Sequence, residues 1–115
     1  MKSSDIKVPE KEIVNAIIEY LQYKKIYCWR NQSTGVYDVK NQAFRRLPKY
    51  ALNGVSDILG ILPNGTFLAI EVKTKTGVAS QNQKDFIQEI KKRKGVAFIA
   101  RSIDEVQSVL KSICG

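Results

Sequence analysis

The sequence contains no histidine and only two cysteines, Cys28 and Cys114, among its 115 residues. Without histidine the chain has no imidazole base, no histidine-containing triad and no histidine metal ligand, so any chemistry must use carboxylates and lysine. Two distant cysteines are too few for a disulfide framework or a zinc site. No apolar run approaches the roughly 18–20 residues of a membrane span, and no signal-peptide pattern follows Met1. We therefore expect a cytoplasmic protein that does not engage a membrane.

Acidic residues are the scarcer charge, and their shortage suggests a partner. The chain has 19 Lys and Arg against 11 Asp and Glu, which gives a net charge of +8. A small domain this basic attracts polyanions, and nucleic acid is the commonest of them. Basicity that only serves solubility is the plainer alternative. With 43% hydrophobic residues, we expect one folded domain over 9–115 behind a flexible arm over 1–8.

Hydrophobic periodicity and turn residues predict an α/β protein. In order, they predict a helix over 9–24, a strand over 26–29, a basic loop over 33–53 with a possible small hairpin at 38–44, a hairpin over 54–73, a helix over 80–94, a strand over 96–100 and a final helix over 102–113. Ser80 and Gln83 have the spacing of a capping box at the start of the helix over 80–94. The strand–helix–strand unit predicts a parallel crossover, and hence a mixed sheet with helices on both faces.

The hairpin over 54–73 is the centre of the chain, and its turn sets its register. Pro63-Asn64-Gly65 suits a three-residue loop, with Gly65 in the left-handed conformation. A loop of this length places Leu62 opposite Thr66 and Asp57 opposite Glu71. A two-residue loop would put the two carboxylates on opposite faces.

Glu71 and Lys73 lie two residues apart in the second strand of this hairpin, so they share one face. The rest of that strand is apolar, and buried ions are costly unless they are paired or bind a metal. Two carboxylates and an ammonium on one patch suit a hard divalent cation such as Mg²⁺. An exposed edge strand with solvated charges is the alternative.

Two other groups of residues have both a functional and a structural explanation. Glu10 and Glu12 lie in the first turn of the first helix, where the helix dipole by itself favours acids. On a helical wheel Glu10 falls nearer the middle of the apolar stripe, and Glu12 falls at its edge. The basic loop over 33–53 interleaves cations with aromatic residues, which suits a nucleic-acid contact surface as well as an ordinary solvated loop.

Taken together, these motifs resemble the PD-(D/E)xK nuclease superfamily, and more closely the stand-alone VRR-Nuc domains of phage and bacteria. The resemblance spans roughly residues 10–110. Its matching segments are Glu12-Ile13 with Ala16-Ile17, Trp29-Arg30-Asn31, Gly54-Val55-Ser56-Asp57-Ile58, Ala69-Ile70-Glu71-Val72-Lys73, Gly77 with Ser80 and Gln83, and Phe98-Ile99-Ala100-Arg101. Ser56 stands where many relatives have proline. The resemblance implies a restriction-endonuclease-like αβββαβ core with an extra C-terminal helix.

The resemblance also implies roles for single residues. Asp57 and Glu71 would hold Mg²⁺ or Mn²⁺, with the backbone carbonyl of Val72 as a further ligand. Lys73 would orient or help to deprotonate the attacking water and stabilise charge on the phosphate. Glu12 would approach the metal through water, and Gln83 would position Lys73 or a water. The DNA contacts that we expect are Arg30, Asn31, Arg45, Arg46, Lys49 and Lys75.

The function implied is a metal-dependent endonuclease that cuts branched DNA such as Holliday junctions, as a homodimer and without an organic cofactor. It would act in the cytoplasm of a bacterial or phage-infected cell. Two alternatives stay open. One is a DNA-binding module that has kept the fold and lost cleavage, and the other is a nuclease that cuts ordinary duplex or flap DNA.

Overall fold

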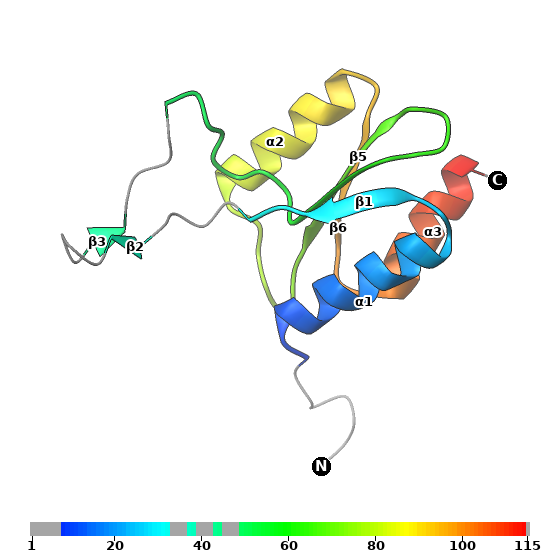
Figure 1. Ribbon diagram of the computed structural model, residues 1–115, viewed down its shortest axis with the longest axis horizontal. Helices are drawn as coiled ribbons and strands as arrows, with labels where there is room; N and C mark the ends of the chain where they lie inside the picture. The colour runs from blue at the N-terminus through cyan, green and yellow to red at the C-terminus, as the bar shows by residue number, and fades with distance from the viewer. Residues whose placement is uncertain (1–7, 33–36, 39–42, 45–48, 115) are drawn as a thin grey trace, which may run out of the picture.

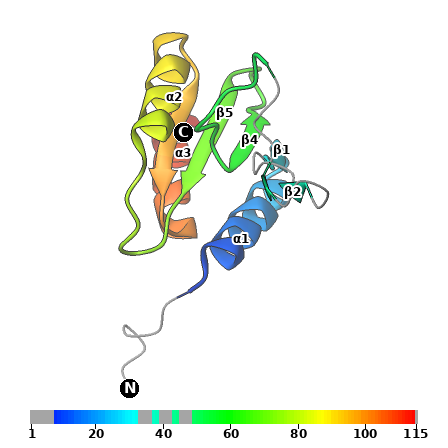
Figure 2. The ribbon, with the colours of Figure 1, turned by 90° about the vertical axis from the view of Figure 1, so that its left-hand side faces the viewer.

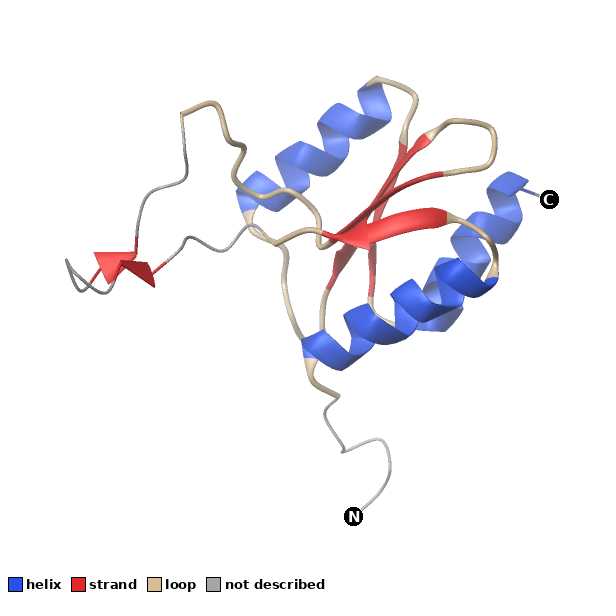
Figure 3. Cartoon of the chain, viewed as in Figure 1, coloured by secondary structure: helices blue, strands red, loops and turns tan. Residues whose placement is uncertain are grey.

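The computed structural model describes residues 8–32, 37–38, 43–44 and 49–114 (Figure 1). The expected arm over 1–8 therefore lies outside the described residues except for Val8. The elements are α1 (Glu10–Tyr23), β1 (Tyr27–Arg30), β2 (Tyr37–Asp38), β3 (Ala43–Phe44), β4 (Ile58–Ile61), β5 (Phe67–Val72), α2 (Gln81–Lys92), β6 (Val96–Ala100) and α3 (Ile103–Cys114), as coloured by type in Figure 3. The order matches the sequence prediction, including the small hairpin, in which β2 pairs with β3.

The four longer strands form one mixed sheet in the order β1-β4-β5-β6. β4 pairs antiparallel with β1 and with β5, and β5 pairs parallel with β6 through the α2 crossover. Both the mixed sheet and the parallel pair were expected from the order of elements. β1 is an edge strand of this sheet.

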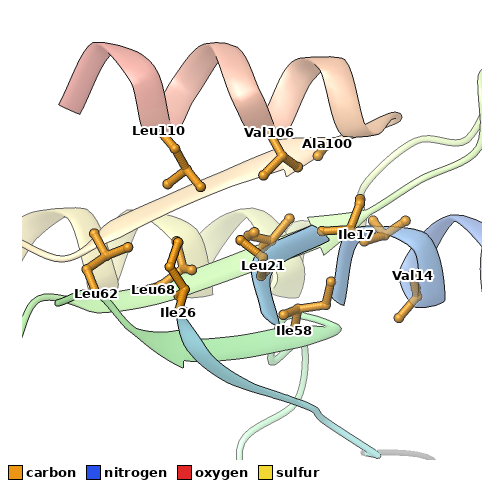
Figure 4. Packing of buried hydrophobic residues seen from close by; sticks show 12 residues of the cluster. Val14, Ile17, Leu21, Ile26, Ile58, Leu62, Leu68, Ala100, Val106 and Leu110 are labelled. Carbon is orange, nitrogen blue, oxygen red and sulfur yellow. The ribbon is translucent and has the colours of Figure 1, made fainter. Parts of the chain in front are cut away.

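Helices cover both faces of the sheet, as predicted. α1 and α3 lie on one face and α2 on the other, so that the sheet is the middle layer (Figures 1 and 2). Figure 4 shows the larger core, where side chains of α1 and α3 meet those of the strands. Its fully buried members include Ile17, Leu21, Leu68, Ile70 and Val106. A smaller cluster beneath α2 contains Ala69, Ile87 and Ala97.

The register of the central hairpin is the one that its turn predicts. Ile58 lies opposite Ile70 and Ile61 opposite Phe67. The N–H of Leu62 donates to the carbonyl of Thr66 at 2.8 Å, and Gly65 has φ +90°. The three-residue loop therefore holds the two strands in the register that brings Asp57 across from Glu71. Within the part of the chain that the structure describes, no helix is both long enough and apolar enough to cross a membrane.

Candidate active site

Three carboxylates from three separate segments meet at one end of the sheet. Glu10 is in the first turn of α1, Asp57 directly precedes β4, and Glu71 is in β5. One carboxylate oxygen from each residue lies within 4.8 Å of those from the other two. We call Glu10, Asp57 and Glu71 the carboxylate cluster.

Asp57 is fixed by backbone hydrogen bonds to the strands on either side. Its Oδ2 accepts a bond of 2.8 Å from the N–H of Val72, and its own carbonyl accepts one of 2.8 Å from the N–H of Asn31. The Asp57 carboxylate is therefore oriented by the sheet before any ligand binds. The Val72 carbonyl as a further metal ligand stays a prediction.

Glu71 is a buried carboxyl group with an incomplete set of partners. It is only 1% exposed, and neither of its carboxylate oxygens makes a hydrogen bond with the described residues. Burial, followed by the adjacent Asp57 carboxyl, raises the pKa of Glu71 from 4.5 to about 8, and Lys73 opposes this change. A buried carboxylate without hydrogen bonds is costly, so the site favours a positive ligand beside Glu71.

Lys73 supplies one positive charge at the site. Its Nζ lies 3.5 Å from Oε2 of Glu71, and its side chain is 13% exposed. As predicted, Lys73 and Glu71 share a face, while Leu68, Ile70 and Val72 point into the core beneath α1 and α3. One ammonium group cannot balance the negative charge of three ionised carboxylates, so the cluster would still attract a divalent cation.

The composition of the carboxylate cluster fits Mg²⁺ or Mn²⁺. Converging carboxylate oxygens are the ligands that these hard ions prefer. Both oxygens of Glu71 are buried without a hydrogen-bond partner among the described residues, which is the condition that a bound cation would relieve. Asp57 and Glu71 could hold the ion directly, and Glu10 is close enough to join them.

The acid that α1 contributes to this cluster is Glu10, whereas the family resemblance indicated Glu12. Glu10 precedes the buried Val14 and Ile17 by four and seven residues, so it lies on the helix stripe that faces the sheet. Glu12 instead lines a separate groove with Arg101 and Asp104, between the starts of α1 and α3. The helical wheel had already placed Glu10, not Glu12, nearer the middle of the apolar stripe. The indirect role expected of Glu12 stays a prediction.

Gln83 closes the start of α2. Its side-chain oxygen accepts a bond of 2.8 Å from the N–H of Ser80, and its own N–H donates to Oγ of Ser80 at 3.2 Å. The predicted capping box is therefore present. Gly54 packs against this helix start with φ +81°, and a Cβ there would lie 2.4 Å from the backbone carbon of Asn82. The expected role of Gln83 beside Lys73 stays a prediction.

Arg101 is a contributor for which the sequence analysis assigned no role. Its guanidinium donates to the backbone carbonyls of Thr74 and Gly77 in the turn that follows Lys73. The N–H of Lys73 also donates to the carbonyl of Ala100 at 3.1 Å. Arg101 is thus a positioning residue for the segment that carries Lys73. The sequence shows an arginine directly after a buried strand, but it could not show the hydrogen-bond partners of this arginine, which lie more than twenty residues away in the chain.

The expected DNA contacts lie in several places. Arg30 and Lys75 are exposed, and Asn31 is half-buried with its amide nitrogen unpaired among the described residues. Lys49 is exposed, and its Nζ lies 5.2 Å from the ring centre of Tyr50. The expected contacts Arg45 and Arg46 fall outside the described residues.

Comparison with known proteins identifies the fold and the family model that fits this chain. The model of the VRR-NUC domain matches residues 9–104. One solved structure, described as a VRR_NUC domain protein, superimposes with a TM-score of 0.66 at 20% identity, covering 92% of this chain and 88% of that one. A second, described as a VRR_NUC domain, gives 0.62 at 19% identity, with 89% and 94% covered. No curated protein matches the sequence. The architecture is α/β and consistent with the restriction-endonuclease-like fold.

Proposed function

We propose that this protein, which belongs to the VRR-NUC domain family, is a divalent-metal-dependent endonuclease that hydrolyses the phosphodiester bonds of DNA. The observation that carries the proposal is the carboxylate cluster with Lys73 beside it. Family membership supports nuclease chemistry with DNA as the substrate. The net charge of +8 supports a polyanionic substrate.

In this proposal Asp57 and Glu71 would hold Mg²⁺ or Mn²⁺, and Glu10 and the Val72 carbonyl could contribute further oxygen ligands. Such an ion supplies positive charge beside the scissile phosphate and makes water a stronger nucleophile at neutral pH. Asp57 needs little reorganisation for this role because the Val72 N–H already orients it. A bound cation would favour the ionised form of Glu71, which burial disfavours in the metal-free site.

Lys73 acts on the substrate side of the same site. From its position 3.5 Å from Glu71, its ammonium group donates hydrogen bonds to the attacking water or to a phosphate oxygen. A fixed positive charge at that point stabilises the negative charge that develops on the phosphate in the transition state. Arg101 supports this step by holding the turn after Lys73.

We further propose that the substrate is branched DNA, such as a four-way junction, and that the protein acts as a homodimer. The described residues form one carboxylate cluster, whereas paired cuts in two arms of a junction need two. A dimer would supply two carboxylate clusters for paired cuts. Arg30, Lys49 and Lys75, with Arg45 and Arg46, would contact the phosphates.

The test is cleavage of a labelled four-way junction, a flap and a matched linear duplex, each with Mg²⁺, Mn²⁺ or EDTA. We expect metal-dependent nicks near the branch point, in pairs, and none with Asp57→Ala. Equal cutting of the linear duplex would refute the preference for branches while leaving the nuclease in place. Binding without cuts in either metal would instead indicate a DNA-binding module that has lost catalysis.

A separate experiment tests the substrate contacts. Replacing Arg45, Arg46 and Lys49 by alanine in one variant should weaken DNA binding and flatten its salt dependence. Fewer phosphates are then contacted, so binding releases fewer counterions. Fluorescence anisotropy at several salt concentrations measures both quantities. Unchanged affinity and slope would show that this loop does not contact DNA.

A further inference from the structure

The face of the sheet that carries Asp57 and Glu71 also carries an exposed aromatic surface. Tyr27 of β1 is 71% exposed, Trp29 of β1 is 40% exposed, and Ile61 of β4 is 41% exposed. α2 packs over β5 and β6 on this face, and among the described helices none packs over its β1 side. Neighbouring exposed aromatic and aliphatic side chains form an apolar patch of the kind that marks binding sites. We call Tyr27, Trp29 and Ile61 the aromatic platform.

Strand register connects the aromatic platform to the carboxylate cluster. Residues directly opposite each other on neighbouring strands point to the same face, so β1, β4 and β5 form rows across the sheet. Three successive rows on this face are Tyr27–Ile61–Phe67, Trp29–Leu59–Ala69 and Asn31–Asp57–Glu71. The bond from the N–H of Asn31 to the carbonyl of Asp57 continues the β1–β4 register into the third row. Trp29 therefore lies one row from Asn31 and Asp57, which are half-buried, while Glu71 at the far end of that row is buried.

The spacing of these rows limits what can lie along them. Two residues of a strand advance about 7 Å, so Trp29 is one such step from the acidic row and Tyr27 is two. Successive bases in B-DNA are only about 3.4 Å apart along each strand. A DNA strand that places successive bases on Trp29 and Tyr27, whose ring centroids are 5.7 Å apart, must therefore have those bases unstacked. Bases in that state are unpaired and offer their faces for stacking.

We propose that the aromatic platform binds unpaired nucleotides next to the scissile phosphate, with one base against Trp29 and the next toward Tyr27. The inference rests on the proposed nuclease function and adds that the DNA is unpaired next to the scissile phosphate. The rings of Tyr27 and Trp29 have centroids 5.7 Å apart and planes inclined by 58°, so each ring offers its own face to a base. Stacking on aromatic side chains is the usual way in which proteins hold single-stranded bases.

Asn31 adds a polar group at the end of the platform. Its Nδ2 is buried and has no hydrogen-bond partner among the described residues, and it shares a row with Asp57 and Glu71. An amide donor at that point suits a phosphate or base oxygen of the bound strand. Because Trp29 lies one row from Asn31 and Asp57, we assign the platform to DNA rather than to a second copy of the chain.

Trp29 is the only tryptophan in the chain, which makes it a direct probe. The wild-type protein is titrated in EDTA with a short oligothymidylate, with an abasic oligonucleotide of equal phosphate number, and with a duplex of equal length. We expect saturable quenching of Trp29 fluorescence by oligothymidylate alone, and about tenfold weaker binding of the abasic strand. Equal affinity without quenching would overturn the proposal. A fluorescence change that depends only on protein concentration would assign the platform to a second copy and also overturn it.

Variants give a second measurement that does not depend on fluorescence. Trp29→Leu should weaken binding of oligothymidylate about tenfold, and Trp29→Phe should restore most of it because a ring can still stack. Tyr23→Leu is the matched control, since Tyr23 is 80% exposed on α1 and lies outside the platform. An equal loss in Trp29→Phe and Trp29→Leu, or in Tyr23→Leu, would contradict stacking.

These binding experiments contain no metal, so their outcome is separate from that of the cleavage assay. Quenching without cleavage in any metal would support the platform and refute the nuclease. Metal-dependent cleavage by a protein that binds abasic and normal strands equally would support the nuclease and refute the platform.

Discussion

The face of the sheet beneath α1 and α3 and the face beneath α2 are built by the same strands, yet they bury different chemistry. On the first face, Leu68, Ile70 and Val72 are completely buried in a continuous apolar core. On the second, the intervening Glu71 is buried beside Asp57 and Lys73, and β1 exposes aromatic rings. Alternation along β5 separates the two sets residue by residue. Stability and proposed function can therefore be altered independently through neighbouring residues.

The largest effect that we expect is on the second face. Lys73→Ala should lower the cleavage rate roughly 10²–10³-fold, because a fixed charge at the scissile phosphate is lost. Metal binding measured by calorimetry should persist, since Lys73 is not a ligand. Lys75→Ala is the control, because Lys75 is exposed and should affect only substrate binding. Full cleavage activity of Lys73→Ala would rule out the assigned role.

On the first face, a core truncation should reduce stability instead. Ile70→Ala removes a fully buried side chain and should lower the free energy of unfolding by about 2–5 kcal/mol. Urea denaturation followed by circular dichroism measures this change. Below the unfolding transition the variant should keep its affinity for metal. A variant of normal stability would show that the two faces are not divided in this way.

A pair of substitutions in α1 tests which acid completes the site. Glu10→Gln should weaken binding of Mn²⁺ about tenfold, because Glu10 lies within 4.8 Å of the other two carboxylates. Glu12→Gln should have the smaller effect, since Glu12 lines a different groove. Calorimetric titration of both variants compares them directly. A larger loss in Glu12→Gln would restore the role that the family resemblance gave it.

The last expected effect is a pH dependence of stability in the metal-free protein, which follows from the raised pKa of Glu71, a value that already includes the opposing effect of Lys73. The folded protein keeps a proton on Glu71 up to a pKa of about 8, whereas the unfolded chain releases it near 4.5. The contribution to stability is therefore fully present below pH 4.5 and is lost as the pH rises to 8. Melting temperatures in EDTA should fall over this range.

Glu71→Gln provides the control for that measurement, because glutamine cannot ionise. Its melting temperature should vary less with pH than that of the wild type between pH 5 and pH 8. Its affinity for Mn²⁺ should also drop, since one ligand oxygen becomes an amide. A wild-type protein whose melting temperature rises over this range would contradict the raised pKa of Glu71.

The features that the sequence determined by itself are local, because each depends only on residues that are close together in the chain. The Pro63-Asn64-Gly65 loop sets the hairpin register, and strand alternation then puts Glu71 and Lys73 on one face. The capping box of Ser80 and Gln83 is equally local. These features depend on backbone geometry over a few residues, so they could be predicted without knowing how distant segments pack.

Only the tertiary structure decided how separate elements meet. The rotation of α1 about its axis brings Glu10 rather than Glu12 into the carboxylate cluster, and this rotation depends on how Val14 and Ile17 pack on the sheet. The placement of α2 over β5 and β6 leaves Tyr27 and Trp29 exposed. Arg101 finds its carbonyl partners across the parallel crossover. Contacts of this kind follow from the packing of whole helices and strands, which no short stretch of sequence encodes.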